Sequence, residues 1–140
     1  MILLDTSGLL SALFADQNRH EECARVLREA PGPRILSPFV LAELDYLIVK
    51  YAGVDAELLL LAEIERGAYE LVSFNEYDID RARKIITRYR DLRIGLADAS
   101  IVVLADRYTT RNVLTLDERH FRAMLAPDRR RFRIFPADAP

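Results

Sequence analysis

Short apolar runs alternate along this chain with longer stretches in which apolar residues recur at helical spacing. The runs too short for helices, which we expect to form strands, are residues 2–4, 35–36, 69–73, 112–116 and 132–135. The segments that we expect to form helices are residues 9–14, 20–30, 38–51, 55–65, 79–89, 96–105 and 118–125. Strands that alternate with helices predict an α/β fold with a central, mainly parallel sheet and helices on both of its faces.

The length and composition of the chain agree with one domain of this kind. A chain of 140 residues, 51% of them hydrophobic, is long enough to bury a core, and we expect residues 1–140 to form a single domain. No stretch is apolar enough to span a bilayer and residues 1–5 lack the features of a signal peptide, so we expect a soluble protein without a membrane partner. The single cysteine, Cys23, is expected in the core and fits a reducing cytoplasm.

The clearest candidate functional residue, Asp5, directly follows the first expected strand. In open α/β sheets the carboxyl ends of the strands form the edge at which ligands bind, because helices cover both faces. Asp5 could instead cap the helix that follows, although Thr6 and Ser7 can each supply a capping oxygen. The sequence alone leaves both interpretations open.

Two further acids fall on segments that are expected to be helical. Glu43 lies three residues after Val40 and four before Leu47, so it shares or borders the inward face, unless it reaches water or pairs with an arginine. Asp98 precedes residues 99–105, which are apolar nearly all round and predict a buried helix. The helix dipole favours an acid in the first turn by only about 0.3 to 1 kcal/mol, which is too little to bury an unpaired carboxylate. We therefore expect Asp98 to need a partner.

The fourth acid, Asp117, follows the expected strand at residues 112–116 and precedes a helix. Helix capping is a serious alternative role for it, because aspartate is among the best N-caps. Thr115 would face the same side of an extended strand, where its hydroxyl could donate a hydrogen bond to a neighbouring acid or to water.

A parallel sheet would bring these four acids to one edge, although they are far apart in the sequence. They are Asp5, Glu43, Asp98 and Asp117. Two carboxylates about 5 Å apart repel by about 3 kcal/mol at an effective dielectric of about 20, so such a group takes up protons or binds metal. Oxygen ligands, in a chain with only two histidines and one cysteine, favour Mg²⁺ or Mn²⁺ over zinc. A metal-activated water at that site would hydrolyse a phosphodiester.

Arginines surround two of the acids in the sequence. The net charge of −2 does not itself indicate a nucleic-acid partner, but of the 20 basic residues only Lys50 and Lys84 are lysines. The arginines nearest to the last two acids are Arg88, Arg90, Arg93, Arg119, Arg122, Arg129, Arg130, Arg131 and Arg133. A guanidinium matches phosphate oxygens in pairs, so these arginines form either a phosphate-binding rim or ordinary solvated helix faces.

Four segments, in this order, resemble the PIN domain and, within it, the VapC-type ribonuclease toxins of bacterial toxin-antitoxin pairs. The segments are LLDTS at 3–7, SPFVLAEL at 37–44, LADASI at 96–101 and TLDERHF at 115–121. The resemblance covers almost the whole chain and implies a PIN-like fold with four metal-binding acids, namely Asp5, Glu43, Asp98 and Asp117. It also implies three hydroxyls that support the site, those of Thr6, Ser7 and Thr115.

The same resemblance implies an activity and partners. The activity is Mg²⁺-dependent endonucleolytic cleavage of RNA, with Mn²⁺ as a substitute for Mg²⁺. The partners are a small antitoxin protein and a second copy of the chain in a homodimer. The four consecutive leucines at residues 58–61 cover more of a helix than one inward face requires. They would therefore form part of an antitoxin groove or a dimer surface, or else belong to the core.

Two alternative functions need residues that this chain lacks, and a third is a PIN fold without catalytic activity. A receiver-like phosphoacceptor domain also gathers acids at strand ends, but it needs a lysine after its last acid-bearing strand, and no lysine follows Lys84. A haloacid-dehalogenase-type phosphatase needs a second aspartate where this chain has Ser7. The remaining alternative is a catalytically silent PIN fold that binds RNA or protein, and the intact acids argue against it.

Overall fold

Five short strands, all parallel, form the centre of the molecule in the order β3-β2-β1-β4-β5. The structure is a computed structural model, and it describes residues 1–139. Its strands are β1 (Ile2–Leu4), β2 (Arg34–Leu36), β3 (Glu70–Leu71), β4 (Asn112–Leu114) and β5 (Arg133–Phe135). The α/β fold with a parallel sheet, which the alternating pattern predicts, is confirmed.

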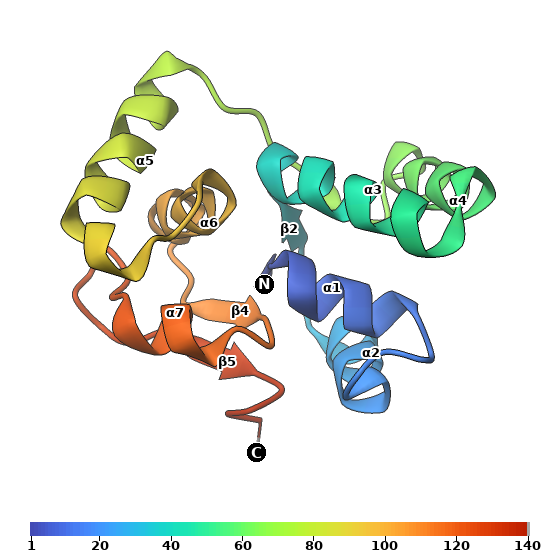
Figure 1. The fold of residues 1–140 in the computed structure, drawn as a ribbon. Coiled ribbons are helices and arrows are strands. Elements are labelled where there is room, and N and C mark those ends of the chain that lie inside the picture. The colour runs from blue at the N-terminus through green and yellow to red at the C-terminus, as the bar shows by residue number, and fades with distance from the viewer. Residues whose placement is uncertain (140) are drawn as a thin grey trace.

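Seven α-helices flank this sheet in the described part of the chain (Figure 1). They are α1 (Thr6–Leu13), α2 (His20–Glu29), α3 (Pro38–Ala52), α4 (Val54–Glu65), α5 (Glu76–Arg88), α6 (Leu96–Arg107) and α7 (Glu118–Ala123). Figure 1 shows α3 against α4 on one side of the molecule and α5 against α6 on the other. Over residues 1–139, no helix is both long and apolar enough to cross a membrane.

The strand order reverses at β1, and this reversal determines where a ligand can bind. β2 and β3 extend from one side of β1, whereas β4 and β5 lie on its other side. In open α/β sheets ligands bind at such a switch point, in the crevice outside the carboxyl ends of the strands. Asp5 directly follows β1 and Asp117 comes shortly after β4, so both acids lie at the switch point.

Local sequence signals account for the starts of two helices. Ser37 caps α3, because its Oγ accepts a hydrogen bond from the backbone N–H of Phe39 at 3.1 Å, and a proline takes the first helical position. α1 begins at Thr6, before the expected residue 9, because the Asp5 carbonyl accepts from the Leu9 N–H at 2.9 Å. The acid at the end of β1 is therefore followed by a helix without an intervening loop.

Two expected strands are shorter by two or more residues in the structure. The run at residues 69–73 forms only β3, whose two residues are exposed and pair with β2 alone at the edge of the sheet. The run at 112–116 ends as a strand at Leu114. The Thr115 N–H still donates to the Phe135 carbonyl at 3.0 Å, but beyond it the Asp117 N–H donates to the Thr115 hydroxyl. Both differences leave the strand order unchanged.

Close packing joins α1 to β4 and buries α6. Residues 99–105 of α6 are all buried, as their apolar character predicts, and Cys23 is also buried in the core. At Gly8 in α1, a Cβ atom would lie 2.5 Å from the carbonyl oxygen of Leu114. Only glycine allows this approach, which places the start of α1 beside the chain that leaves β4.

Candidate active site

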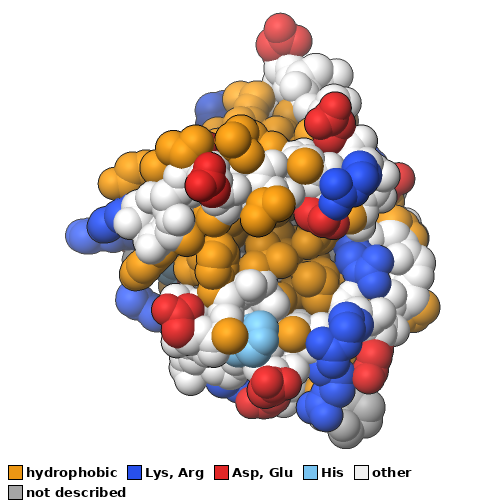
Figure 2. All heavy atoms as spheres, turned by 90° about the vertical axis from the view of Figure 1, so that its right-hand side faces the viewer, with side chains coloured by type: hydrophobic (Ala, Val, Ile, Leu, Met, Phe, Trp, Pro, Cys, Tyr) orange, Lys and Arg blue, Asp and Glu red, His pale blue; other side chains and the backbone are white. Residues whose placement is uncertain are grey.

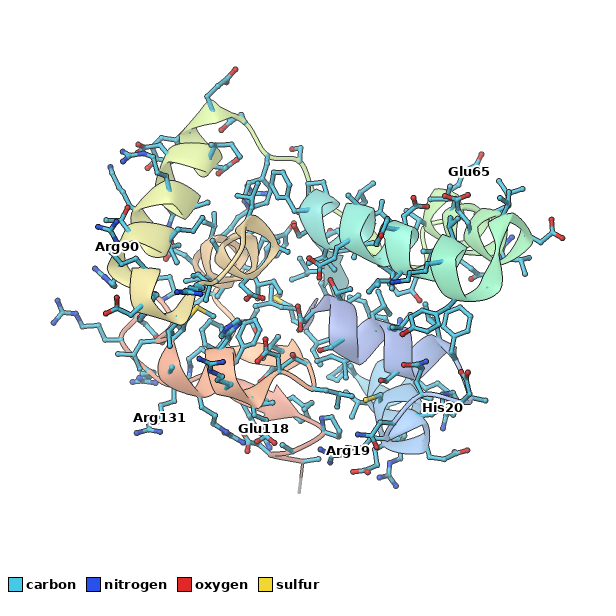
Figure 3. The ribbon with its side chains drawn as sticks, viewed as in Figure 1. Arg19, His20, Glu65, Arg90, Glu118 and Arg131 are labelled. Carbon is cyan, nitrogen blue, oxygen red and sulfur yellow. The ribbon has the colours of Figure 1, made fainter. Side chains whose placement is uncertain are left out.

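One cavity at the carboxyl edge of the sheet is lined by all four of the predicted acids. It has a volume of about 290 Å³, and we refer to it as the acid pocket, after Asp5, Glu43, Asp98 and Asp117 in its lining. The elements that carry these acids, α1, α3, α6 and α7, surround the centre of Figure 3. A larger cavity of about 510 Å³, between α2 and the chain after β5, has mixed charge and contains none of the four. Acids from four separate segments therefore share one pocket.

Asp5 is 4% exposed and is held in place by two hydroxyls. It occupies the N-cap position of α1, but its Oδ2 accepts hydrogen bonds from Thr115 Oγ1 at 2.6 Å and Ser7 Oγ at 3.0 Å. The pKa of Asp5 is raised from 3.8 to about 6, mainly by burial and also by the charge of Asp98. The two hydroxyls act in the opposite direction, because they stabilise the ionised carboxylate.

The same two hydroxyls connect the end of β1 to the chain after β4. Ser7 Oγ accepts from the backbone N–H of Leu116 at 3.0 Å, and Thr115 Oγ1 accepts from that of Asp117 at 2.9 Å. The predicted hydrogen bond from Thr115 to a neighbouring acid is therefore observed. Each hydroxyl orients Asp5 and also fixes the backbone that leads to Asp117.

The Thr6 hydroxyl lines the acid pocket without a hydrogen-bond partner. Thr6 is buried, and its Oγ1 is the only buried side-chain polar atom of residues 1–139 for which no partner is found. A buried polar group left unpaired costs about 1 to 3 kcal/mol.

Asp98 lies in the first turn of α6, and its direct partner is a histidine. His120 Nδ1 lies 2.8 Å from Asp98 Oδ2 and 3.0 Å from Asp117 Oδ2. Burial raises the pKa of Asp98; the hydrogen bond with His120 opposes this, and the charges of Asp117 and Glu43 add to it. The partner that the buried setting of Asp98 requires is therefore present, and it is not an arginine.

Asp117 combines the two roles that its sequence position allows. Its Oδ1 caps α7 by accepting from the backbone N–H of His120 at 3.1 Å, while its side chain also lines the acid pocket. Capping and pocket lining are thus compatible rather than alternative roles for this acid.

Glu43 is exposed, so it does not share the inward face of α3, and the alternative in which it reaches water holds. The buried face of α3 consists of Val40, Leu44 and Ile48, which recur at every fourth residue. Glu43 precedes Leu44 by one residue and is therefore turned about 100° away from that face. It lies at the open edge of the acid pocket, where solvent reaches it.

The acid pocket contains negative charge that no arginine neutralises. None of the four acids takes part in an arginine ion pair anywhere in residues 1–139. Mg²⁺ and Mn²⁺ prefer carboxylate oxygens and water as ligands. The donor set of the pocket therefore fits a hard divalent cation.

Three of the arginines near the acids in sequence lie elsewhere in space or have other partners. Arg122 is bound by Asp138 at 2.9 and 2.7 Å and by Glu118 at 3.0 Å. Figure 3 shows Arg90 and Arg131 at the outer surface on the side of α5 and α7, pointing away from the centre. The phosphate-binding rim stays a prediction for the remaining arginines.

Comparison with known proteins agrees with this geometry. The sequence matches the model of the PIN domain over residues 2–124. The chain belongs to the PIN domain family. It is 44% identical to Ribonuclease VapC26 of Mycobacterium tuberculosis (strain ATCC 25618 / H37Rv) over 135 residues, which are 96% of this chain and 100% of that relative. The resemblance to VapC-type PIN proteins, which the four sequence segments indicate, is confirmed.

Solved structures show the same PIN fold. VapC20 of Mycobacterium tuberculosis, a sarcin-ricin loop cleaving toxin, superposes with a TM-score of 0.77 at 20% identity, over 84% of this chain and 90% of that chain. FitAcB from Neisseria gonorrhoeae gives 0.58 at 21% identity, over 78% and 83%. A toxin-antitoxin complex from Klebsiella pneumoniae gives 0.58 at 21% identity, over 80% and 87%.

Sequence reasoning missed His120, which joins two acids of this PIN domain. A partial signal was available, since His120 lies three residues after Asp117 and residues so spaced at the start of a helix share a face. No sequence signal links His120 to Asp98, because the two are 22 residues apart and meet only through the placement of α6 beside α7.

Proposed function

We propose that this protein is a metal-dependent endoribonuclease and that it acts as the toxin of a type II toxin-antitoxin system. The observation that carries the proposal is the acid pocket at the switch point of the sheet, in which four carboxylates meet without an arginine. The similarity to a VapC ribonuclease over nearly the whole chain supports RNA as the substrate. A cytoplasmic location fits that substrate and the unpaired thiol of Cys23.

The proposed reaction is hydrolysis of an RNA phosphodiester bond by water. The four acids of the pocket would hold Mg²⁺, and Mn²⁺ would substitute for it. When bound, the ion lowers the pKa of a coordinated water and offsets the charge that develops on the leaving oxygen. Asp5 supplies a fixed oxygen, because the hydroxyls of Ser7 and Thr115 orient it. Glu43 supplies an adjustable one, because it stands exposed at the edge of the pocket.

The test is cleavage of labelled RNA by the purified protein, with Mg²⁺ and with EDTA. We expect cleavage that needs Mg²⁺, that Mn²⁺ also supports, and that Asp5→Asn and Glu43→Gln each abolish. Glu65→Gln is the matched control, because Glu65 is exposed on α4 and lies far from the centre of the molecule in Figure 3. Binding of RNA without cleavage would instead indicate a catalytically silent PIN domain, and cleavage that persists in EDTA would refute the metal site.

The proposed protein partner is an antitoxin, and α4 offers a surface for it. Leu58, Leu59 and Leu61 are 57%, 71% and 39% exposed, whereas Leu60 is 5% exposed. Figure 2, which faces the side of α1 to α4, shows hydrophobic side chains at the centre of that face. The leucines at 58–61 are thus mostly surface rather than core, and an exposed apolar patch of this kind marks an interaction site.

The charge of α4 indicates what kind of segment would bind there. The acids of this helix are Asp55, Glu57, Glu63 and Glu65. An antitoxin segment with apolar and basic side chains would match both the leucines and these acids. The predicted homodimer is the competing occupant of the same surface.

Calorimetry with the cognate antitoxin and light scattering of the chain alone decide between the two occupants. Leu59→Ser should weaken the complex by about tenfold or more, as loss of a central apolar contact does. Leu71→Ser is the control, because Leu71 is also exposed but lies on the edge strand β3. An unchanged affinity in Leu59→Ser would refute the antitoxin surface, and a dimer that this variant converts to a monomer would assign the surface to a second copy.

A further inference from the structure

His120 contacts two acids of the acid pocket. The residues that line the pocket include Asp98 and Asp117 but not His120, whose side chain is 18% exposed. Its Nδ1 nevertheless lies within 3.0 Å of an oxygen of each of these acids. The histidine therefore contacts both acids without lining the pocket itself.

The direction of these contacts follows from the chemistry of the groups. When Asp98 is ionised, its Oδ2 can only accept, so Nδ1 carries the proton in the 2.8 Å contact between them. The backbone N–H of His120 also donates, to Asp117 Oδ1 at 3.1 Å. One residue thus donates to two acids that come from different helices, and it orients both carboxylates.

We propose that His120 is a positioning residue that sets the separation and orientation of Asp98 and Asp117 for the cation. This inference depends on the metal-dependent function proposed above. Ligating carboxylates are themselves held by hydrogen bonds from groups behind them, and loss of such a group lowers metal affinity by about 10- to 100-fold. We assign His120 this role rather than that of a ligand because it does not line the pocket, although its ring nitrogen lies within 4.8 Å of an oxygen of each acid.

Packing alone does not explain the side chain of His120. The next residue, Phe121, is 1% exposed and packs edge to face on Phe132 at a centroid distance of 5.5 Å. Phe121 therefore anchors the short helix α7 in the core. The imidazole, 18% exposed, places its Nδ1 beside the two acids.

The test compares three substitutions that differ in where they place a donor. His120→Asn keeps an N–H near the position of Nδ1, His120→Gln moves the amide one bond further out, and His120→Ala removes it. Binding of Mn²⁺ is followed by its electron paramagnetic resonance signal, and folding by thermal unfolding in EDTA. His20→Ala is the control, because the only other histidine bonds to the Ser11 carbonyl, away from the pocket.

We expect His120→Ala to weaken Mn²⁺ binding by about 10- to 100-fold and His120→Asn to restore most of it, whereas His120→Gln does not. Wild-type affinity in both His120→Ala and His120→Gln would overturn the proposal. Strong coupling of a histidine nitrogen to bound Mn²⁺ would also overturn it, in favour of direct ligation. If the alanine variant does not fold, the comparison of asparagine with glutamine still decides. If the wild type itself fails to bind Mn²⁺, the metal-dependent function fails instead.

Discussion

The buried carboxyl of Asp5 should make the metal-free protein less stable as the pH rises. Its pKa is about 6 in the folded chain against 3.8 for an exposed aspartate. Because the folded-state value is the higher one, the folded chain holds this proton more tightly than the unfolded chain. The stability that the protonated form contributes is therefore fully present below pH 3.8 and is lost as the pH rises through about 6.

The size of this effect follows from the same two values. One pKa unit corresponds to 1.36 kcal/mol, so the difference amounts to about 3 kcal/mol of unfolding free energy between acid and neutral pH. Asp5→Asn removes the charge, and its amide oxygen in the position of Oδ2 can still accept from both Thr115 and Ser7. At neutral pH we expect the metal-free variant to be more stable than the wild type by up to about 3 kcal/mol.

Urea unfolding in EDTA over a series of pH values measures this difference, with Asp16→Asn as the control at an exposed acid. The unfolding free energy of the wild type and of the control should fall as the pH rises through about 6, and that of Asp5→Asn should fall less, because only Asp98 of this pair still has a raised pKa. Added Mg²⁺ should restore stability to the wild type at neutral pH, because a ligand that binds only the folded chain stabilises it. Parallel pH profiles for wild type and Asp5→Asn would refute this reasoning.

Three more substitutions test the contacts around the acid pocket. Asp98→Asn should abolish RNA cleavage yet leave the melting temperature in EDTA at or above that of the wild type, because repulsion in the pocket falls; a large loss would make Asp98 a structural residue instead. Thr115→Val should lower stability by about 1 to 3 kcal/mol and raise the pKa of Asp5, and an unchanged Asp5 titration by nuclear magnetic resonance would contradict this. Gly8→Ala should destabilise the fold by about 1 to 3 kcal/mol in calorimetry, since its Cβ would lie 2.5 Å from the Leu114 carbonyl oxygen; wild-type stability would show that α1 can shift.

The features that could be predicted from the sequence are those that local chemistry determines. The apolar run before Asp5 is too short for a helix, and it forms β1. Ser37 followed by proline predicts the start of α3, and the helix starts there. Residues 99–105 predict a buried helix because they lack a polar face, and α6 is buried over those residues. Each of these predictions depends only on residues that are close to one another in the sequence.

The features that could not be predicted depend on how distant segments are placed. Periodicity puts Glu43 close to the inward face of α3, but only the position of the helix decides that the pocket leaves it exposed. The contact of His120 with Asp98 depends in the same way on two helices that are not adjacent in the sequence. Side-chain exposure and partners across the pocket are tertiary properties, and a single sequence carries little information about them.

The position of the acid pocket follows from strand order rather than from any one motif. β4 is the fourth strand in the chain but pairs with β1, so the carboxyl ends of these two strands, which lead to Asp5 and Asp117, lie side by side. Had β4 joined the sheet beyond β3, Asp117 would lie three strands away from Asp5, and Thr115 could not donate to Asp5 while accepting from the Asp117 N–H. The hydrogen bond from Thr115 Oγ1 to Asp5 Oδ2 at 2.6 Å therefore depends on the β1–β4 pairing as well as orienting the acid. Any substitution that separates these two strands should weaken the proposed metal site even when all four acids remain.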